Sequence, residues 1–577
     1  MKHLWKFTFG ALALALASCS SEAPAPNNGN DADGDVYATL KIKLPSATRA
    51  DNANPAGQEY GQDSENYVGK ILVVLTQKDK NEDYWFLTYD EADAMGGDNI
   101  DPDHENGTVS ELKYTLNFSA KDMKPSALGV AGENGQSEIY VFAFCNPTTR
   151  LRSIVSNWAN SKDPVKFNGN STGLIDKDNT IWNEKNFLMT NCHIPEAVTL
   201  PSRSQLVQNN NTPEKAFNLG TVHVKRVAAR FDFALGGKNA DNKYEIKNTT
   251  GEGPMGTVEL TDMAMFNIAN NFYYLPRINN QWDWNGTTTL CGNLEDGYVM
   301  SYNQDNFKTG TLSSSNYKQY YFANLIGNEF KPGNTDDRTA GSTALNWTSI
   351  RPDDWNNKTQ DNNDGWTWDP KNDYRIWRYA TENTIPAADA QNSTAAQKIG
   401  ITTGVVFKGT FTPANTDVWN GNVIYLYNGL VYGDFKALKA YVTKYPESVV
   451  AGAFKKVNAL NNAGDDTDLK TNLLENLSTD QRNGFKAYVP DAGKNTYTMY
   501  YFYYNRHNSN GNNSQMGENE FGVVRNNVYK LQVTTCGSLG EPEAPENPDH
   551  PDEVEKAYFT VSCHVMPWTV RINNIEF

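Results

Sequence analysis

The stretch "VYATLKIKL", residues 36–44, alternates strictly between apolar and polar side chains. This period of two is typical of a β-strand with one buried face. Pro45 follows directly and cannot donate a hydrogen bond to a sheet, so the strand should end there. The residues expected to be buried share one face of this first strand: Val36, Ala38, Leu40, Ile42 and Leu44.

The same pattern recurs along the chain, separated by stretches rich in Asn, Gly and Asp that favour turns. Two segments predict helices: 433–446, with Asp434 as N-cap and Pro446 as stop, and 466–478, with leucines four residues apart. The fold class is therefore mainly β, with sandwiches favoured and a few short helices. Further strands are expected in 70–77, 138–147, 220–235, 403–413, 422–433, 497–505 and 522–536.

The chain has 577 residues, of which 38% are hydrophobic, and this length suits two to four domains. Its net charge is −17, and it shows no basic stripe. An acidic chain of this kind is repelled by nucleic acid and by anionic lipid, so no nucleic-acid partner is expected.

The first residues, "MKHLWKFTFGALALALASCS", have two lysines followed by an apolar run too short to span a membrane. This is typical of a signal peptide. Leu16-Ala17-Ser18-Cys19 matches a bacterial lipobox, in which the Cys19 thiol receives a diacylglycerol and becomes the new N-terminus. An ordinary signal peptide with an incidental cysteine is the alternative. The polar stretch that follows Cys19 is too poor in apolar residues to fold.

Residues that could support catalysis or bind a cofactor form no recognisable site. The histidines make no HExxH pattern, and no GxSxG, P-loop or GxGxxG motif follows a predicted strand. Residues 101–107, "DPDHENG", resemble a calcium loop, but Gly107 is one position late and Leu112 stands where the bidentate glutamate belongs. The five cysteines after Cys19 are widely spaced, as expected of buried small side chains. We therefore expect no enzyme, no metal and no cofactor.

A Pro-rich and acidic linker precedes the last segment of the chain. Prolines recur at every third position from 542 to 551, and seven acids lie between Glu541 and Glu555. This spacing suits a stiff polyproline II spacer, which about 15 residues would extend to roughly 45 Å. Such a spacer suits delivery of the following strand to a distant site, whereas the alternative is a connection back to the chain's own sheet.

Residues 557–577, "AYFTVSCHVMPWTVRINNIEF", again alternate. The register is expected to shift at Met566-Pro567, which gives two short strands joined at a bend. A segment of this kind could fill an open edge of another sheet. Its residues expected to enter such a groove are Phe559, Val561, Cys563, Val565, Trp568, Val570 and Ile572.

Arg49 offers a way to open such an edge. It lies in "PSATRAD", a small and polar stretch of the kind that proteases cut, and the alternative is an ordinary loop arginine. Cleavage between Arg49 and Ala50 would release the lipid, the tether and the first strand. The sheet would then expose unpaired backbone groups to another strand.

Taken together, these features resemble the fimbrillins of type V pili, and among them the shaft subunits of a minor fimbrium. The resemblance extends over most of the chain and is weakest at about 280–380. The stretches that carry it are the lipobox at Cys19, "SATRA" at 46–50, "FLMTNC" at 187–192, "VKRVAARF" at 224–231, "YATENT" at 379–384, "GVVFKGTFTP" at 404–413, "VVRNNVYKLQV" at 523–533, the acidic linker and "VMPWTVRINNIEF" at 565–577.

The resemblance implies two transthyretin-like β-sandwich domains and a tethered C-terminal donor strand. It also implies export as a lipoprotein, cleavage by an Arg-specific protease at Arg49–Ala50, and filaments in which a neighbour's last strand replaces the first. The expected partners are other copies, accessory tip and anchor pilins, and an unknown surface ligand. The expected segments are 1–19 (signal peptide), 20–49 (propeptide with the removable strand), 50–235 and 236–536 (domains), 537–556 (linker) and 557–577 (donor strand).

Two other functions remain open. A lipoprotein that stays anchored through Cys19 could bind a glycan or a host protein through aromatic clusters at 282–286, 366–369 and 500–507. Residues 500–507 could instead be a core strand. A tip or anchor subunit of the same pilus is the second alternative, but the paired Arg49 site and tethered strand favour the shaft.

Overall fold

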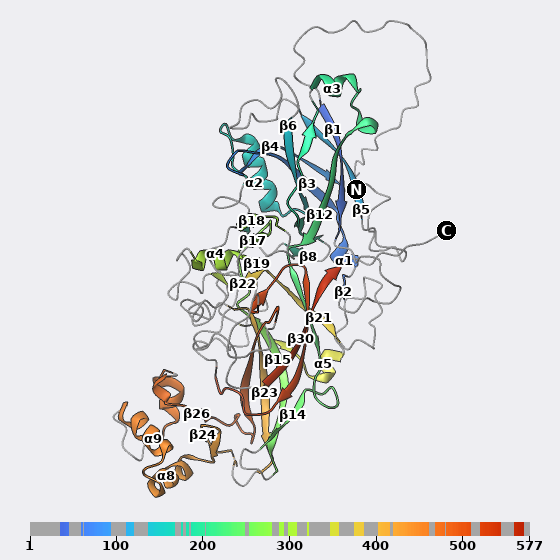
Figure 1. Cartoon of the computed structure of the whole chain (residues 1–577). Coiled ribbons are helices and arrows are strands. Elements are labelled where there is room, and N and C mark those ends of the chain that lie inside the picture. Colours follow the sequence, from blue (N-terminus) through green and yellow to red (C-terminus); the bar gives the residue numbers. More distant parts are fainter. Residues whose placement is uncertain are drawn as a thin grey trace, which may run out of the picture.

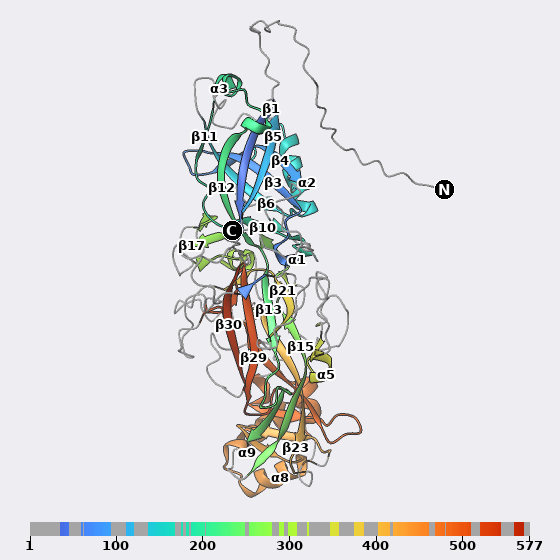
Figure 2. The same cartoon turned by 90° about the vertical axis from the view of Figure 1, so that its right-hand side faces the viewer.

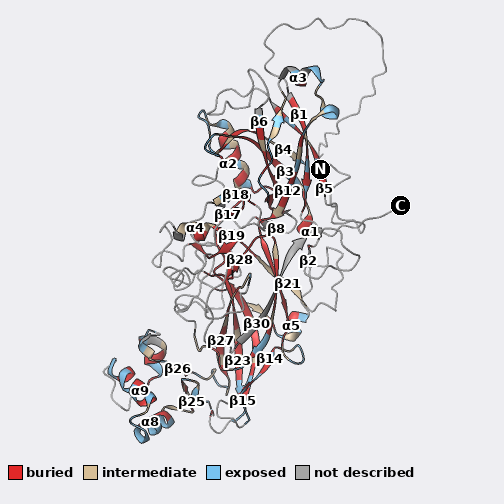
Figure 3. Ribbon diagram, viewed as in Figure 1, coloured by how far each residue is buried: buried red, intermediate tan, exposed pale blue. Residues whose placement is uncertain are grey.

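The computed structural model places most strands in two β-rich lobes, one above the other in Figure 1. Figure 3 shows the buried residues concentrated along these strands. The mainly β prediction is confirmed. The described residues are 35–44, 59–61, 63–93, 111–119, 137–167, 175–176, 181–183, 186–201, 203–247, 253–279, 288–292, 298–308, 320–321, 345, 347–356, 374–385, 402–415, 419, 421–460, 468–478, 480–508, 520–543 and 559–569.

The N-terminal lobe is built on an eight-stranded sheet. Helix α2 (Thr149–Asn160) packs Leu151, Val155 and Trp158 into its core, and Thr148 caps the helix by accepting from the Leu151 N–H. In order across the sheet the strands are β4 (Tyr84–Asp93), β3 (Lys70–Lys78), β6 (Ser137–Cys145), β10 (Met189–Asn191), β12 (Phe217–Arg226), β1 (Asp35–Lys43) and β5 (Glu111–Ser119), with β11 (Val198–Leu200) beside β6.

The C-terminal lobe pairs two five-stranded sheets around one apolar core, which is the arrangement of a sandwich. Phe233 and Leu531 from the first sheet and Phe407 from the second belong to this core. The first sheet runs β2 (Glu59–Tyr60), β30 (Phe559–Thr569), β29 (Asn527–Cys536), β13 (Ala229–Ala234) and β21 (Arg375–Ala380). The second runs β14 (Lys243–Lys247), β15 (Pro254–Phe266), β23 (Gly404–Pro413) and β27 (Tyr497–Tyr504), with β20 (Thr348–Ser349) beside β15.

The chain changes lobe earlier than the predicted joint at 235/236. Strand β12 lies in the N-terminal sheet, whereas β13 pairs with β29 and β21 in the C-terminal lobe. The apolar run 220–235 therefore divides at Val227–Ala228, and both of these residues still belong to the N-terminal core. Continuous alternation hid this division, because a strand pattern does not reveal which sheet its strand joins.

A small helical module (residues 421–488) projects from the C-terminal lobe, at the lower left of Figure 1. Helix α8 (Phe435–Lys444) begins as predicted, with the Ala437 N–H donating to Asp434 Oδ1 over 2.6 Å. Helix α9 (Val449–Leu460) and helix α2 were not predicted, although both carry buried residues at helical spacing. The module also contains β24 (Ile424–Tyr427), β25 (Leu430–Tyr432), β26 (Phe485–Tyr488), a π-helix (Asn472–Asn476) and a 3-10 turn (Asp480–Arg482).

Shorter elements fill the connections and the junction between the lobes. They are α1 (Asp63–Asn66), α3 (Arg203–Gln208), a 3-10 turn (Pro213–Lys215), α4 (Tyr302–Lys308), α5 (Pro352–Asn356), β7 (Ile175–Asp176), β8 (Trp182–Asn183), β9 (Asn186–Phe187), β16 (Phe272–Tyr273), β17 (Arg277–Asn279), β18 (Thr288–Leu290), β19 (Tyr298–Val299), β22 (Asn383–Thr384) and β28 (Gly522–Val523).

Candidate strand-exchange site

Strand β1 occupies a slot inside the N-terminal sheet, with a hydrogen-bonded neighbour on each side. It pairs with β5 in antiparallel register from Asp35 opposite Ser119 to Lys43 opposite Glu111. On its other side it runs parallel to β12, with Ile42 opposite Val222. Figure 2 shows β12, β1 and β5 side by side. Without β1, the facing edges of β5 and β12 would both lose their backbone partners.

The side chains of β1 are divided as its sequence predicted. The residues at 36, 38, 40, 42 and 44 are all buried, and Leu40 and Ile42 have no exposed surface. Lys41 and Lys43 are exposed on the other face. Full burial of a Val, Leu or Ile side chain contributes roughly 1.5–3 kcal/mol, so β1 supplies a large share of the stability of this lobe.

The slot is not a uniform ladder. The pairing of β1 with β12 shifts between Thr39 and Lys41, and opposite this shift Gly220 adopts φ +88°. The Gly220 N–H donates to the side chain of Asn218 over 3.0 Å. Glycine suits this bulge because side chains rarely adopt that backbone angle.

Asn211 precedes the first residue of β12 and extends the slot on that side. Its Oδ1 accepts from the Tyr37 N–H over 2.7 Å, and its Nδ2 donates to the Tyr37 carbonyl over 2.9 Å. A side-chain amide thus replaces the next residue of a neighbouring strand. Sequence reasoning missed this residue, because an Asn in the run 209–211 resembles an ordinary turn signal.

We expect Asn211→Ala to lower the free energy of unfolding by about 1–2 kcal/mol, because two hydrogen bonds to Tyr37 are lost and their backbone groups must find water. Urea unfolding followed by fluorescence measures the change. Asn218→Ala, which removes only the bond to Gly220, is the matched control and should cost less. Equal effects of the two substitutions would contradict a special role for Asn211.

The chain segments before and after the predicted cleavage point are held by different sheets. Strand β1 lies in the N-terminal sheet, whereas β2 runs parallel to β30 in the C-terminal lobe, with Glu59 opposite Trp568. Arg49, Ala50 and Cys19 lie outside the described residues. A cut at 49–50 would therefore leave β1 attached only through its pairing and packing.

In the single chain, the terminal strand β30 lies on its own lobe. It pairs antiparallel with β29, from Phe559 opposite Cys536 to Pro567 opposite Asn527. This is the alternative in which the linker returns the strand to its own sheet. Val561 packs against the C-terminal core, while Val570 and Ile572 lie outside the described residues. The remaining predicted donor positions, Phe559, Cys563, Val565 and Trp568, all fall within β30.

The predicted break at Met566–Pro567 is wrong. Strand β30 runs through both residues, and its register with β29 is unbroken from Val561 to Pro567. The irregularity lies at the other end, where the register shifts between Val533 and Thr535 of β29. β30 lies next to the rim of its sheet, with only the two-residue β2 outside it, so a residue without an N–H is tolerated near the strand's end.

Buried ion pairs hold α1, which follows β2, against two strands of the C-terminal lobe. Arg230 donates to Glu65 Oε2 at 2.9 Å and bridges to Asp232 at 2.9 Å. The Tyr379 hydroxyl donates to Glu65 Oε1 at 2.6 Å. Glu65 lies on α1, directly after β2, and is fully buried. The segment that follows the predicted cut is therefore held at the junction.

Two further arginines complete this junction. Arg226 donates to the Glu65 carbonyl over 3.0 Å and to Asn526 Oδ1, and burial lowers the pKa of its guanidinium. Arg525 forms a bidentate pair with Glu382 at 2.8 and 2.9 Å and also donates to the backbone carbonyls of Tyr273 and Tyr274. The three motifs "VKRVAARF", "YATENT" and "VVRNNVYKLQV" thus meet at the junction.

His507 lies just after the C-terminal end of β27 and is expected to make the stability of the fold depend on pH. His507 Nδ1 lies 3.0 Å from the Tyr529 hydroxyl, which also accepts from the Val524 N–H. Burial lowers the pKa of His507 from its usual 6.5 to about 4. Protonation is therefore easier in the unfolded chain than in the folded chain between these two values.

We expect stability to be highest above pH 6.5 and to fall as the pH drops toward 4, because the unfolded state binds the extra proton. The full pKa shift corresponds to about 3 kcal/mol, and partial exposure of the imidazole should reduce this to roughly 1–2 kcal/mol. Urea unfolding at several pH values measures the slope. His507→Gln should flatten it, and an unchanged slope in that variant would contradict this assignment.

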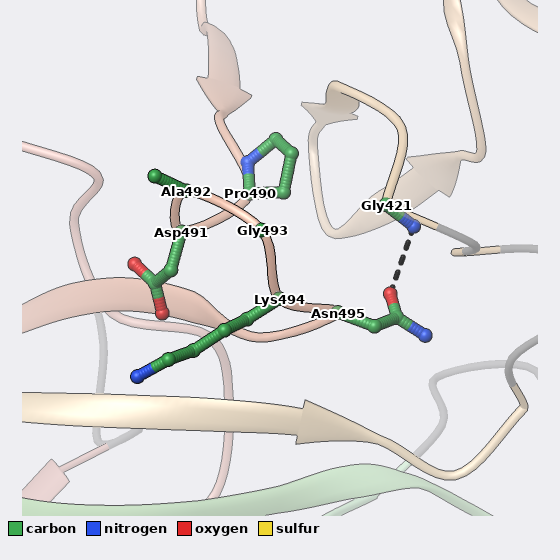
Figure 4. A pocket seen from close by; sticks show the side chains of 7 residues that line it. All are labelled: Gly421, Pro490, Asp491, Ala492, Gly493, Lys494 and Asn495. Atoms are coloured by element: carbon green, nitrogen blue, oxygen red, sulfur yellow. Dashed lines mark hydrogen bonds between the residues drawn. The ribbon is translucent and has the colours of Figure 1, made fainter.

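A metal ion and a surface pocket were the remaining kinds of site to place among the described residues. These residues contain no cluster of His, Cys, Asp or Glu suited to a metal ion. A shallow hollow lined by Gly421 and residues 490–495 is a surface turn, in which Gly421 donates to Asn495 Oδ1 at 2.8 Å (Figure 4). Asp491 there accepts from the hydroxyls of Thr496 and Thr498, so its carboxylate is already bound.

Other sequence hypotheses can be placed in part. Cys145, Cys192, Cys291 and Cys536 are buried, as predicted, and burial raises the pKa of Cys145 and of Cys536 to about 12. Strand β27 alternates between buried and half-buried residues, so its aromatics belong to the core and not to a glycan site. Residues 101–107, 282–286 and 366–369 lie outside the described residues. In the described part of the chain, no helix is long and apolar enough to cross a membrane.

Several solved structures are similar to the chain at a low level. A putative cell adhesion protein from Parabacteroides distasonis has 12% identity and a TM-score of 0.37, covering 94% of this chain and 100% of its own. A fimbrilin from Porphyromonas gingivalis has 14% identity and a TM-score of 0.37, covering 93% and 99%. The tip fimbrial protein of P. gingivalis, with C-terminal truncation, has 10% identity and a TM-score of 0.30, covering 93% and 100%. TM-scores this low support no inference about function.

The family comparison is more specific. No curated protein matches the chain. Residues 495–574 match the family described as major fimbrial subunit protein type IV, fimbrillin, C-terminal. This stretch contains β27, β28, β29 and β30 and therefore includes the terminal strand. The resemblance to the fimbrillins is confirmed, and residues 495–574 are the part of the chain that matches the C-terminal region of that family.

Proposed function

We propose that this chain is a structural subunit of a cell-surface fimbrium. It is exported as an outer-membrane lipoprotein that carries its lipid on Cys19. An Arg-specific protease then cuts it after Arg49. The cut subunit polymerises as the terminal strand of another copy replaces β1, and the filament serves adhesion and biofilm formation. The fimbrillin match supports a fimbrial role and indicates a structural protein, not an enzyme.

The observation that carries the proposal is the position of β1. It is an interior strand of its sheet but the first described segment of the chain, and the segment after the predicted cut is held by the other lobe. Most interior strands are joined at both ends to other strands of the fold, so one cut cannot release them. A removable strand in such a slot is suited to replacement by β-strand addition.

Repeated replacement between copies gives an open chain of subunits, because a donor strand and an acceptor slot are different surfaces. β30 must separate from β29 before it can enter the slot of another copy. Among the described residues, only the two-residue β2 pairs with the outer edge of β30. Tip and anchor pilins would terminate such a filament at its two ends.

The N-terminus of the subunit in sheared native filaments tests the proposal. Mass spectrometry should find Ala50 as the first residue. Lipidated Cys19 in the filament subunit would contradict removal of β1. That result would favour an anchor subunit, or a surface lipoprotein that binds a glycan or a host protein.

A further inference from the structure

We propose that the helical module binds the chain's own acidic linker (537–556), and that helix α9 is the docking surface for residues 544–556 of this linker. This intrachain docking surface goes beyond the proposed role as a fimbrial subunit. It concerns the uncut single chain, and its test does not depend on strand exchange.

The beginning of the linker already lies on the module. Glu541 pairs with Lys486 of β26, and Glu543 pairs with Arg482 of the neighbouring 3-10 turn. The Tyr488 hydroxyl donates to the Gly540 carbonyl over 2.6 Å. The first two acids of the linker therefore use basic side chains of this module, and the chain continues from this point.

The surface beyond Arg482 is basic and apolar, although the whole chain is acidic. The turn that carries Arg482 contacts α9. Residues 435–460, which include α8 and α9, contain five lysines and a single glutamate. On α9, Lys455 and Lys456 are exposed, as are Val449 and Leu460, with exposed fractions of 74% and 51%.

The spacing of the linker fits such a surface. Each of its four prolines is followed by an acid, so the acids at 543, 546, 549 and 552 recur at every third position. A polyproline II segment has three residues per turn, which would place these four carboxylates on one edge, about 9 Å apart. Glu543 already faces Arg482 on that edge, so Glu546 and Asp549 would next meet the lysines of α9. The prolines would cover the apolar side chains, as in other proline-rich ligands.

Zero-length carbodiimide cross-linking of the dilute, uncut chain tests this contact, because the reagent joins only a carboxylate and an amine that touch. The Lys486–Glu541 pair is the internal positive control. Mass spectrometry should find Lys455 or Lys456 joined to Glu546 or Asp549. A mixture of isotopically labelled and unlabelled chains should show that these links lie within one chain.

Charge reversal gives an independent readout. The double variant Lys455→Glu/Lys456→Glu should be cut at Glu546 and Glu553 by a Glu-specific protease about fivefold faster than the wild type, since two exposed ion pairs are lost. The matched control, Lys436→Glu/Lys444→Glu on α8, should match the wild type. Circular dichroism checks that both variants remain folded.

Three results would overturn the proposal. The first is a Lys486–Glu541 link without any link from the later acids to α9. The second is links only between labelled and unlabelled chains. The third is equal cleavage rates in the two double variants.

Discussion

Subunits cut after Arg49 should assemble into ladders that survive unheated detergent gels, and Arg49→Gln subunits should remain single chains under the same treatment. In the uncut chain, β1 and Leu44 directly after it fill the slot with five buried side chains, and β1 has hydrogen bonds on both sides. Its covalent link to the rest of the molecule makes replacement unfavourable, because the displaced strand stays at high local concentration.

Cleavage alone should not empty the slot. Burial of Val36, Leu40, Ile42 and Leu44 contributes roughly 6–12 kcal/mol, which is comparable with the whole stability of a typical domain. A nicked subunit should therefore keep β1 until another strand displaces it. Assembly should accordingly be slow and should depend on subunit concentration.

A synthetic peptide of residues 35–44, in large excess, should slow assembly at least about tenfold, because it refills the slot. The same peptide with Leu40→Lys is the matched control, since it would bury a charge where Leu40 has no exposed surface. Gel densitometry over time measures both. Equal ladders with the two peptides would show that the slot of β1 does not govern assembly.

The second large effect concerns the junction of the lobes. Glu382→Gln should lower the free energy of unfolding by about 3–5 kcal/mol, because it leaves the buried Arg525 guanidinium without its counter-charge. Both side chains have an exposed fraction of 1%, so water cannot replace the lost carboxylate. Urea unfolding measures the change.

Two further variants separate charge from packing. Glu245→Gln, on the exposed face of β14, should change stability by less than about 0.5 kcal/mol. The double variant Glu382→Leu/Arg525→Met should lose less than Glu382→Gln, because removing both charges also removes the unpaired one. A double variant as unstable as the single one would mean that packing, and not charge, dominates at this position.

The strand pattern of the sequence predicted local structure well. Strands β23, β27 and β29 fall within predicted segments, and β1, β3 and β6 exceed theirs by one residue at one end. Each of these strands shows an alternation of apolar and polar residues, or an apolar run, that reflects only which of its own side chains are buried. The cap of α8 was equally local, since it involves Asp434 and the third residue after it.

The failures concern partners that lie far away in sequence. Nothing in the residues 220–235 indicates that their two halves join different sheets. β30 pairs with β29, which lies on the other side of the linker in sequence. The alternation of β30 would be the same if it paired with a strand of another copy. Asn211 acts on Tyr37, which lies 174 residues earlier, so no short motif could reveal it.

The motifs that carry the family resemblance also left their contacts with distant residues unpredicted. Arg226, Glu382 and Arg525 lie in three separate motifs, and no short stretch indicates that they meet. In the folded chain they lie at one buried junction, where each positive charge is held by carboxylates, amides or carbonyls. These motifs therefore describe how the lobes are joined, while the strands at the two ends of the chain concern assembly.

The structure of an assembled filament by electron cryo-microscopy tests the central claim most directly. We predict that the slot between β5 and β12 is filled by residues 559–569 of a neighbouring subunit, with residues 35–44 absent. Density for residues 35–44 in that slot, together with β30 still paired with β29 of its own chain, would contradict strand exchange.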